Sequence, residues 1–247
     1  MLVLAGIGLR FKDIPIETIK EIKRADYVFL DFYTSVYPDI DRIKRLRKDI
    51  KIVDRKFVEE ELEDVLIKEK NKRIVLLVIG DPLFATTHFS LIEFCIKNKI
   101  KYKIIHAPSI FNYISRTGLF LYKFGEIASI PFHESEYPYE VLKNNKEKGY
   151  HTLFLLDLDP VSNNYLSPSD ALKKLLDLER KRKENVISLE DKIIILERMG
   201  WKDECIYYGK ISKIMSREWK KYPYSIIFPG KINKIEEEFL KLVSKNV

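Results

Sequence analysis

Short apolar runs alternate with charged, amphipathic stretches along the first half of the chain. Each run ends near a turn-forming residue, and this alternation is typical of buried strands joined by helices in a parallel sheet. The predicted helices are 16–23, 59–70 and 89–98, and Pro108 and Ser109 open a further helix. The predicted strands of this half are 3–7, 27–32, 50–54, 74–79 and 102–106.

Beyond Gly118 the strands are separated by longer connections. The predicted strands are 128–132, 152–158, 192–197, 204–209 and 225–228, and the predicted helices are 138–148, 169–182 and 234–245. A chain of 247 residues is long enough for two modest domains, which we place at 1–115 and 116–247. The expected fold class is α/β, with a mostly parallel sheet in the first domain, a mixed sheet in the second and a ligand cleft between them.

The composition is that of a globular protein with a charged exterior. Hydrophobic residues make up 46% of the chain, yet no apolar run approaches the roughly 18 residues that a membrane span needs. We therefore expect a cytoplasmic protein without a membrane partner. The net charge of +7 permits an acidic partner, but basic and acidic residues are interleaved, as in 173–185. This pattern favours a solvated helix face, so direct nucleic-acid binding is not expected.

The cysteines and histidines show no spacing that indicates a site. Cys95 and Cys205 lie far apart without a CxxC motif, which indicates neither a disulfide framework nor structural zinc. The four histidines are scattered without ligand spacing, so no metal is predicted. The chain also contains no Ser nucleophile elbow and no Walker A sequence.

Two glycine-containing strand ends are candidates for ligand binding. Gly6 and Gly8 follow the first strand and form either a ligand-facing loop or only a tight exit from a core strand. A dinucleotide-binding fingerprint needs a third glycine where this chain has Phe11, which disfavours a nicotinamide oxidoreductase. The strand at 74–79 ends in Gly80 and Asp81. The Asp81 carboxylate can accept hydrogen bonds from ribose hydroxyls or an ammonium group, or it can cap its own turn, and the spacing leaves both roles open.

A third strand end begins a helix at Pro108 and Ser109, whose backbone amides can bind an adenine edge or a carboxylate, or form an ordinary helix cap. Three such ends in one sheet could line one crevice. Thr86 and Thr87 are expected to be caps. In the second half, Asp157 and Asp159 are candidates for a cationic ligand, although turn formation is the commoner role for such acids. Lys123 is either solvated or attracts a carboxylate or an acidic protein surface.

Taken together, these motifs resemble the diphthine synthases of the tetrapyrrole methylase superfamily along nearly the whole chain. The whole set of motifs in this order is far more specific for the family than the tripeptide Gly80-Asp81-Pro82 alone. The matching segments are GIGL (6–9), FYTS (32–35), GDPLFATTH (80–88), HAPSI (106–110), TGLFLYKFG (117–125), SIPF (129–132), HTLFLLDL (151–158) and IIFPG (226–230).

The resemblance implies two α/β domains with S-adenosylmethionine folded into the cleft between them, in a homodimer. Two stretches depart from the common archaeal pattern, because RMG (198–200) stands where an RAG-like stretch is usual and Tyr224 stands where a His is usual. Carried over by position, the resemblance implies cofactor contacts at Leu9, Asp81, Phe84, Ser109, Ile110, Leu156, Met199 and Tyr224.

The implied reaction is repeated methylation of the amino group of the 3-amino-3-carboxypropyl-histidine of translation elongation factor 2, in diphthamide biosynthesis. The sulfonium already makes the methyl group electrophilic, so the reaction demands no single general base, and we name no catalytic residue from the sequence. Two alternatives are a small-molecule tetrapyrrole methylase of the same superfamily and a non-catalytic basic module that binds RNA or protein. The former would not be expected to combine FYTS, YKFG and HTLFLLD.

Overall fold

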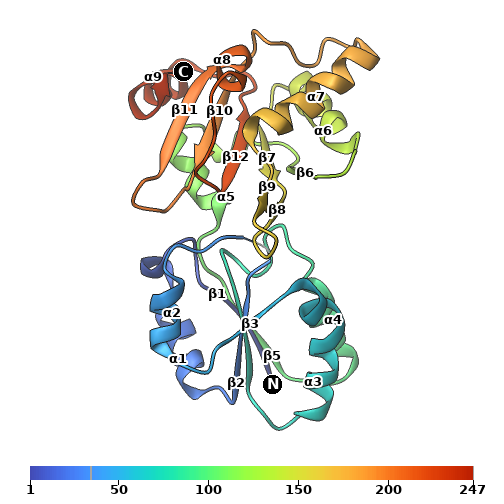
Figure 1. Cartoon of the computed structure of the whole chain (residues 1–247), viewed down its shortest axis with the longest axis vertical. Helices are drawn as coiled ribbons and strands as arrows, with labels where there is room; N and C mark the ends of the chain where they lie inside the picture. Colours follow the sequence, from blue (N-terminus) through green and yellow to red (C-terminus); the bar gives the residue numbers. More distant parts are fainter. Residues whose placement is uncertain (34, 247) are drawn as a thin grey trace. The chain divides into compact units, whose positions relative to one another are not determined.

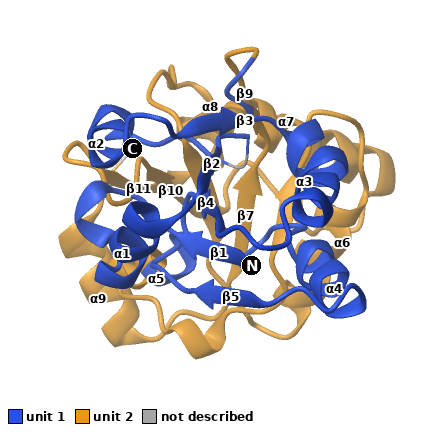
Figure 2. Ribbon diagram, turned by 90° about the horizontal axis from the view of Figure 1, so that it is seen from below, with its two compact units in different colours: residues 1–112, 159–161 blue, residues 113–158, 162–247 orange. Residues whose placement is uncertain are grey.

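The computed structural model describes residues 1–33 and 35–246, and these form two compact units. Unit 1 contains Met1–Asn112 and Asp159–Val161, and unit 2 contains Tyr113–Leu158 and the chain from Ser162 onward (Figure 2). Each unit has its own sheet and its own core, so the two are described separately.

Unit 1 is built on a five-stranded sheet with the order β3-β2-β4-β1-β5, in which every pair of neighbours is parallel. This arrangement confirms the parallel sheet predicted from the apolar runs. Helices α1 and α2 cover one face of the sheet, and α3 and α4 cover the other (Figure 1). The strands are β1 (Leu2–Gly6), β2 (Tyr27–Asp31), β3 (Lys51–Val53), β4 (Ile74–Val78) and β5 (Tyr102–Ile105), and the helices are α1 (Ile16–Arg24), α2 (Ile40–Leu46), α3 (Leu62–Lys68), α4 (Phe89–Lys97) and the short α5 (Ile110–Tyr113).

Both faces of the central strands β1 and β4 are buried, which explains why these strands are apolar at every position. Successive side chains of a strand point to opposite faces. In β1, Val3 and Ala5 join the core beneath α1 and α2, whereas Leu2 and Leu4 join the core beneath α3 and α4.

Unit 2 is built on a six-stranded mixed sheet with the order β13-β11-β10-β12-β7-β6. The pairs β6 with β7 and β11 with β13 are parallel, and the other neighbours are antiparallel. A separate hairpin is formed by β8 and β9. The strands are β6 (Ala128–Ile130), β7 (Thr152–Leu156), β8 (Leu158–Asp159), β9 (Asn164–Tyr165), β10 (Lys192–Glu197), β11 (Cys205–Lys210), β12 (Tyr224–Phe228) and β13 (Lys245–Asn246), and the helices are α6 (Tyr137–Glu147), α7 (Pro168–Arg182), α8 (Ile211–Met215) and α9 (Lys234–Val243).

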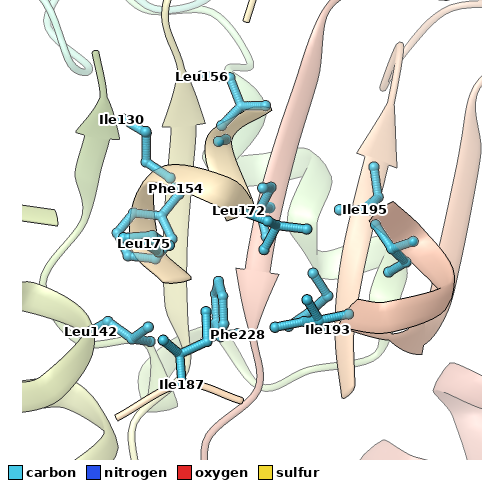
Figure 3. Packing of buried hydrophobic residues seen from close by; sticks show 14 of the residues in the cluster. Ile130, Leu142, Phe154, Leu156, Leu172, Leu175, Ile187, Ile193, Ile195 and Phe228 are labelled. Carbon is cyan, nitrogen blue, oxygen red and sulfur yellow. The ribbon is translucent and has the colours of Figure 1, made fainter. Parts of the chain in front are cut away.

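The main core of unit 2 lies between one face of this sheet and helices α6, α7 and α8. Figure 3 shows Leu142 of α6 and Leu172 of α7 among strand residues such as Phe154, Ile193 and Phe228. The rings of Phe154 and Phe228 meet edge to face with their centroids 5.7 Å apart. Complete burial of so many apolar side chains makes this cluster a major source of the stability of unit 2.

The elements that the sequence did not predict are short. In α2 only Ile43 is buried, and in α8 only Ile211 and Ile214 are buried. One or two buried positions do not establish a helical period, because neighbouring residues must repeat the pattern before it differs from chance. The hairpin β8–β9 and the strand β13 have only two residues in each strand.

Candidate active site at the carboxyl edge of the unit 1 sheet

The loops that follow β1 and β4 are joined by hydrogen bonds at the second residue after each strand. The Gly8 N–H donates to the Gly80 carbonyl at 3.3 Å, and the Gly80 N–H donates to the Gly8 carbonyl at 2.9 Å. Both glycines have a positive φ, +70° at Gly8 and +79° at Gly80, which other residues adopt at a cost. The two glycines thus connect segments that lie about 70 residues apart in the chain.

The loop that follows β5 meets the same point because Gly6 has no side chain. A Cβ atom at Gly6 would lie 2.7 Å from the Gly80 carbonyl oxygen and 2.8 Å from Cβ of Ala107. Such distances are too short for carbon atoms, so the close approach of the three loops requires glycine here. The three strand ends that were predicted to line one crevice are therefore adjacent.

Asp81 lies at the centre of these loops. Its Oδ1 accepts the Leu83 N–H at 3.0 Å, which is the turn-capping role that the sequence allowed. Its Oδ2 accepts the Ala107 N–H at 3.3 Å and lies 2.8 Å from Nδ1 of His106. Because each carboxylate oxygen can accept two hydrogen bonds, Oδ1 retains capacity for a further donor.

The space beside Asp81 is bordered by Leu9 and Ser109. A Cβ atom at Gly80 would lie 3.6 Å from Cβ of Ser109 and 3.8 Å from Cδ2 of Leu9, so it would fill the space between these two side chains. With glycine at position 80, the space that this atom would take stays free between the two side chains. The Ser109 N–H donates to Oδ1 of Asn112 at 3.0 Å, and the Ser109 hydroxyl accepts the Phe111 N–H at 3.3 Å, as in a helix cap.

An aromatic pair borders the same loops. The half-buried Phe84 stacks on Phe111 with ring centroids 5.4 Å apart and an interplanar angle of 27°. Ile110 is the first residue of α5 and precedes Phe111 directly. Leu9, Asp81, Phe84, Ser109 and Ile110, which were predicted from different parts of the sequence, thus all lie at one edge of the unit 1 sheet.

A buried histidine anchors the loop that contains Asp81. Nδ1 of His88 lies 3.1 Å from the Pro82 carbonyl, and its Nε2 lies 3.2 Å from Oδ2 of Asp31 at the end of β2. The side chains of His88 and Asp31 are both fully buried. Asp31 also accepts the Tyr33 N–H of the FYTS motif at 3.1 Å, whereas Thr34 of that motif lies outside the described residues. The sequence did not predict this pairing, because 57 positions separate the two residues.

The remaining predicted contacts belong to unit 2, where they lie at one end of its sheet. Leu156 ends β7, Tyr224 begins the neighbouring β12, and Met199 follows β10 on the other side of β12. The hydroxyl of Tyr224 accepts the Lys221 N–H at 2.6 Å, and its ring packs edge to face on Trp219. All three of the predicted residues are buried, and the Tyr224 hydroxyl is engaged within the protein.

Several other candidates have local structural partners. Asp159 accepts the Val161 N–H at 3.0 Å, as expected for a turn former. Asp157 instead accepts the Leu158 N–H at 3.0 Å and the N–H of Phe132, 25 positions earlier in the chain, at 3.1 Å. The expected helix-capping role of Thr86 and Thr87 is not seen, because α4 begins after His88 without a side-chain cap. Instead the Thr86 hydroxyl donates to the Pro82 carbonyl at 2.9 Å, and the Thr87 hydroxyl donates to Glu59 at 3.2 Å.

Lys123, which was expected to be solvated or to attract an external carboxylate, binds an internal one. Its ammonium donates to Glu236 of α9 and to the Lys231 carbonyl, the latter at 2.6 Å. Glu236 is fully buried and also accepts the Phe120 N–H at 2.9 Å and the Asn233 N–H at 3.0 Å. Nε2 of the buried His151 lies 3.1 Å from the same carboxylate. We call Lys123, His151 and Glu236 the buried charge cluster.

Comparison with known proteins assigns the chain to a family. The model of the tetrapyrrole (corrin/porphyrin) methylases matches residues 1–215. Diphthine synthases from Methanococcus maripaludis and Methanocaldococcus jannaschii are 39% and 38% identical to this chain, over 255 and 257 aligned positions. Each alignment covers 100% of both chains. The chain belongs to the diphthine synthase family of tetrapyrrole methylases.

Solved structures agree with this assignment to the diphthine synthases. A crystal structure of diphthine synthase matches with a TM-score of 0.89 at 27% identity, covering 100% of this chain and 96% of the other. Membership makes the chain a methyltransferase. Within residues 1–33 and 35–246, no helix is both long and apolar enough to cross a membrane, and no three His, Cys, Asp or Glu residues are grouped to hold a metal ion.

Proposed function

We propose that this diphthine synthase family member transfers methyl groups from S-adenosylmethionine to the amino group of a 3-amino-3-carboxypropyl-histidine in translation elongation factor 2. The family assignment supports the reaction class. The observation that carries the site is the meeting of three loops around Gly80, with the Asp81 carboxylate next to the space that Gly80 leaves free between Leu9 and Ser109.

The residues present at this edge fit such a cofactor. Oδ1 of Asp81 has remaining capacity for a ribose hydroxyl or the ammonium of the methionine part, and Leu9 and Phe84 supply apolar surface. When bound, S-adenosylmethionine would supply a methyl group that its sulfonium already makes electrophilic. The residues of the chain would then hold the acceptor amine in line with the methyl–sulfur bond and prevent approaches from other directions.

Contacts from Leu156, Met199 and Tyr224 remain part of this proposal, on the basis of the family resemblance. Elongation factor 2 as substrate, a homodimeric assembly and a cytoplasmic location are proposals on the same basis. Light scattering of the purified protein tests the assembly, since a homodimer has twice the mass of one chain.

Two measurements test the function. Calorimetric titration with S-adenosylhomocysteine tests cofactor binding, and mass spectrometry of modified elongation factor 2 incubated with enzyme and methyl donor tests transfer in steps of one methyl group. Methylation of a tetrapyrrole but not of the protein substrate would support the small-molecule alternative. Absence of heat together with absence of any mass gain would refute the proposal.

The Asp81→Ala variant tests the site itself. Loss of a charge-assisted contact should weaken S-adenosylhomocysteine binding by about 1–3 kcal/mol. Asp64→Ala is the matched control, because Asp64 is an exposed carboxylate on α3, where it has no place in the site. Unchanged affinity together with a lower melting temperature would restrict Asp81 to capping its turn.

A further inference from the structure

His106 and Asp81 form a pair in which a carboxylate orients an imidazole. The Nδ1 atom of His106 lies 2.8 Å from Oδ2 of Asp81. An ionised carboxylate can only accept hydrogen bonds, so Nδ1 carries a proton, and in the neutral form of the ring Nε2 is the nitrogen with the lone pair. The Leu83 and Ala107 N–H groups hold the carboxylate in this position. A base oriented by a third group in this way is the arrangement found at many catalytic sites.

The basic nitrogen of His106 is accessible. The His106 side chain is 69% exposed, whereas that of Asp81 is 16% exposed. In the part of the chain that the structure describes, Nε2 of His106 has no hydrogen-bonding partner. His88 and His151 differ, because each is buried with both ring nitrogens facing protein groups. His106 therefore combines an exposed Nε2 without a protein partner in the described residues with a place beside the proposed cofactor contacts.

Methyl transfer to an amine needs a lone pair that the ammonium form lacks. Amines of this kind have ordinary pKa values between about 8 and 10, so the acceptor is mostly protonated near neutral pH. Each transfer also returns the nitrogen to a positively charged state, and a second transfer needs the loss of another proton. One proton must therefore leave for every methyl group added to a substrate that enters as ammonium.

We propose that His106 is the general base of this methyl transfer and that Asp81 is its positioning residue; the inference rests on the proposed function above. An N–H bond of the substrate ammonium breaks, Nε2 of His106 takes the proton, and the electron pair stays on the amine nitrogen. That pair forms the bond to the methyl carbon while the carbon–sulfur bond breaks, and its electrons go to sulfur. The imidazolium remains bonded to Asp81 and releases its proton to water between rounds, because the ring is exposed.

The variants His106→Gln and His106→Ala test this role. Near pH 7 each is expected to lose about 100-fold in kcat. The deficit should shrink by about tenfold for each pH unit up to the pKa of the amine, because free amine then forms without help. Added imidazole should restore part of the rate of His106→Ala. The affinity for S-adenosylhomocysteine should stay within about twofold of the unmodified protein, a change of under 1 kcal/mol.

His133→Gln is the matched control, since His133 is an exposed histidine of unit 2 whose side chain has no role in the proposal. It should keep the full rate at every pH. An unchanged rate in His106→Ala would overturn the role of His106, as would a deficit that is constant with pH and insensitive to imidazole. A loss of cofactor affinity as large as the loss of rate would also overturn it. If the unmodified protein transfers no methyl group, the proposed function itself fails.

Discussion

Glu236→Gln is expected to destabilise unit 2 strongly, because the buried charge cluster directs four donors at one carboxylate. These are the Lys123 ammonium, the His151 ring and the N–H groups of Phe120 and Asn233. Glutamine keeps one acceptor oxygen but replaces the other by an NH₂ group that would face donors. The substitution also removes the counter-ion of Lys123.

The size of this effect can be worked from the burial of the two partners. Removing one member of a buried ion pair typically costs about 3–5 kcal/mol. The Glu236 side chain is fully buried, but that of Lys123 is 22% exposed and also bonds the Lys231 carbonyl, so we expect the lower end, about 3 kcal/mol. For a chain of this size that corresponds to a fall in Tm of roughly 6–12 °C in a calorimetric scan.

Acidification gives a second measurement of the same cluster. Burial alone would raise the pKa of Glu236, but hydrogen bonds from Lys123, Phe120, Asn233 and His151 lower it to about 2, against an ordinary value of 4.5. The unfolded chain therefore binds a proton before the folded one does. The stabilisation is present above pH 4.5 and is lost as the pH falls towards 2. The stability gap between wild type and Glu236→Gln should close over that range.

His151 also makes the folded protein less stable on acidification, but its effect begins at a higher pH than that of Glu236. Its Nδ1 accepts the Gly230 N–H at 2.9 Å while Nε2 faces Glu236, so the ring is held as the neutral tautomer. Burial lowers the pKa of His151 although Glu236 opposes this. Since the unfolded histidine is protonated first, stability should already begin to fall as the pH drops below its ordinary 6.5.

Glu237→Gln is the control for these experiments, because Glu237 is the next residue of α9 and forms an exposed pair with Lys241 at 2.6 Å. Its loss should cost less than about 0.5 kcal/mol. A Tm of Glu236→Gln within about 2 °C of this control, less than 1 kcal/mol in a chain of this size, would refute the reasoning. So would parallel acid unfolding curves for Glu236→Gln and the wild type.

Three further substitutions test other parts of the structure. Gly8→Ala should lower the stability by about 2 kcal/mol or more, since φ is +70° and the new Cβ would lie 2.2 Å from Cβ of Asp13; denaturant unfolding measures this. Tyr139→Phe should cost about 2 kcal/mol in the same assay, because the buried hydroxyl donates to Glu179 at 2.9 Å, and no loss would contradict that bond. Leu172→Ala should cost about 2–5 kcal/mol, since Leu172 is fully buried in the unit 2 core, and a cost below about 1 kcal/mol would contradict tight packing there.

The strands could be predicted because a buried strand is recognisable from its own few residues, without knowledge of its neighbours. A run such as Ile74–Val78 is apolar at every position only when both faces of its sheet are covered. The carboxyl ends of parallel strands share an edge, so a common crevice for Gly8, Asp81 and Ser109 followed from the strand assignment alone.

The pairings of side chains could not be predicted in this way. His106 was part of a recognised motif, but its bond to Asp81 depends on the strand order β4-β1-β5, which a single sequence does not reveal. Lys123 and Glu236 are 113 positions apart, and both belong to segments where charged residues are usually solvated. The sequence did carry one signal for His106: as the first residue after β5, it is expected at the carboxyl edge of the sheet, where ligands bind.

The position of β1 in its sheet has a consequence for the making of the protein. The first strand to be synthesised lies between β4 and β5, so the apolar segment Leu2–Gly6 leaves the ribosome long before either neighbour exists. At about 5–20 residues per second, β5 is completed roughly 5–20 s later. During this interval the sheet of unit 1 cannot be completed, because β1 lacks one of its neighbours. A nascent chain that stops before His106 would lack one of the three loops, so the proposed site can form only when nearly all of Met1–Asn112 has been synthesised.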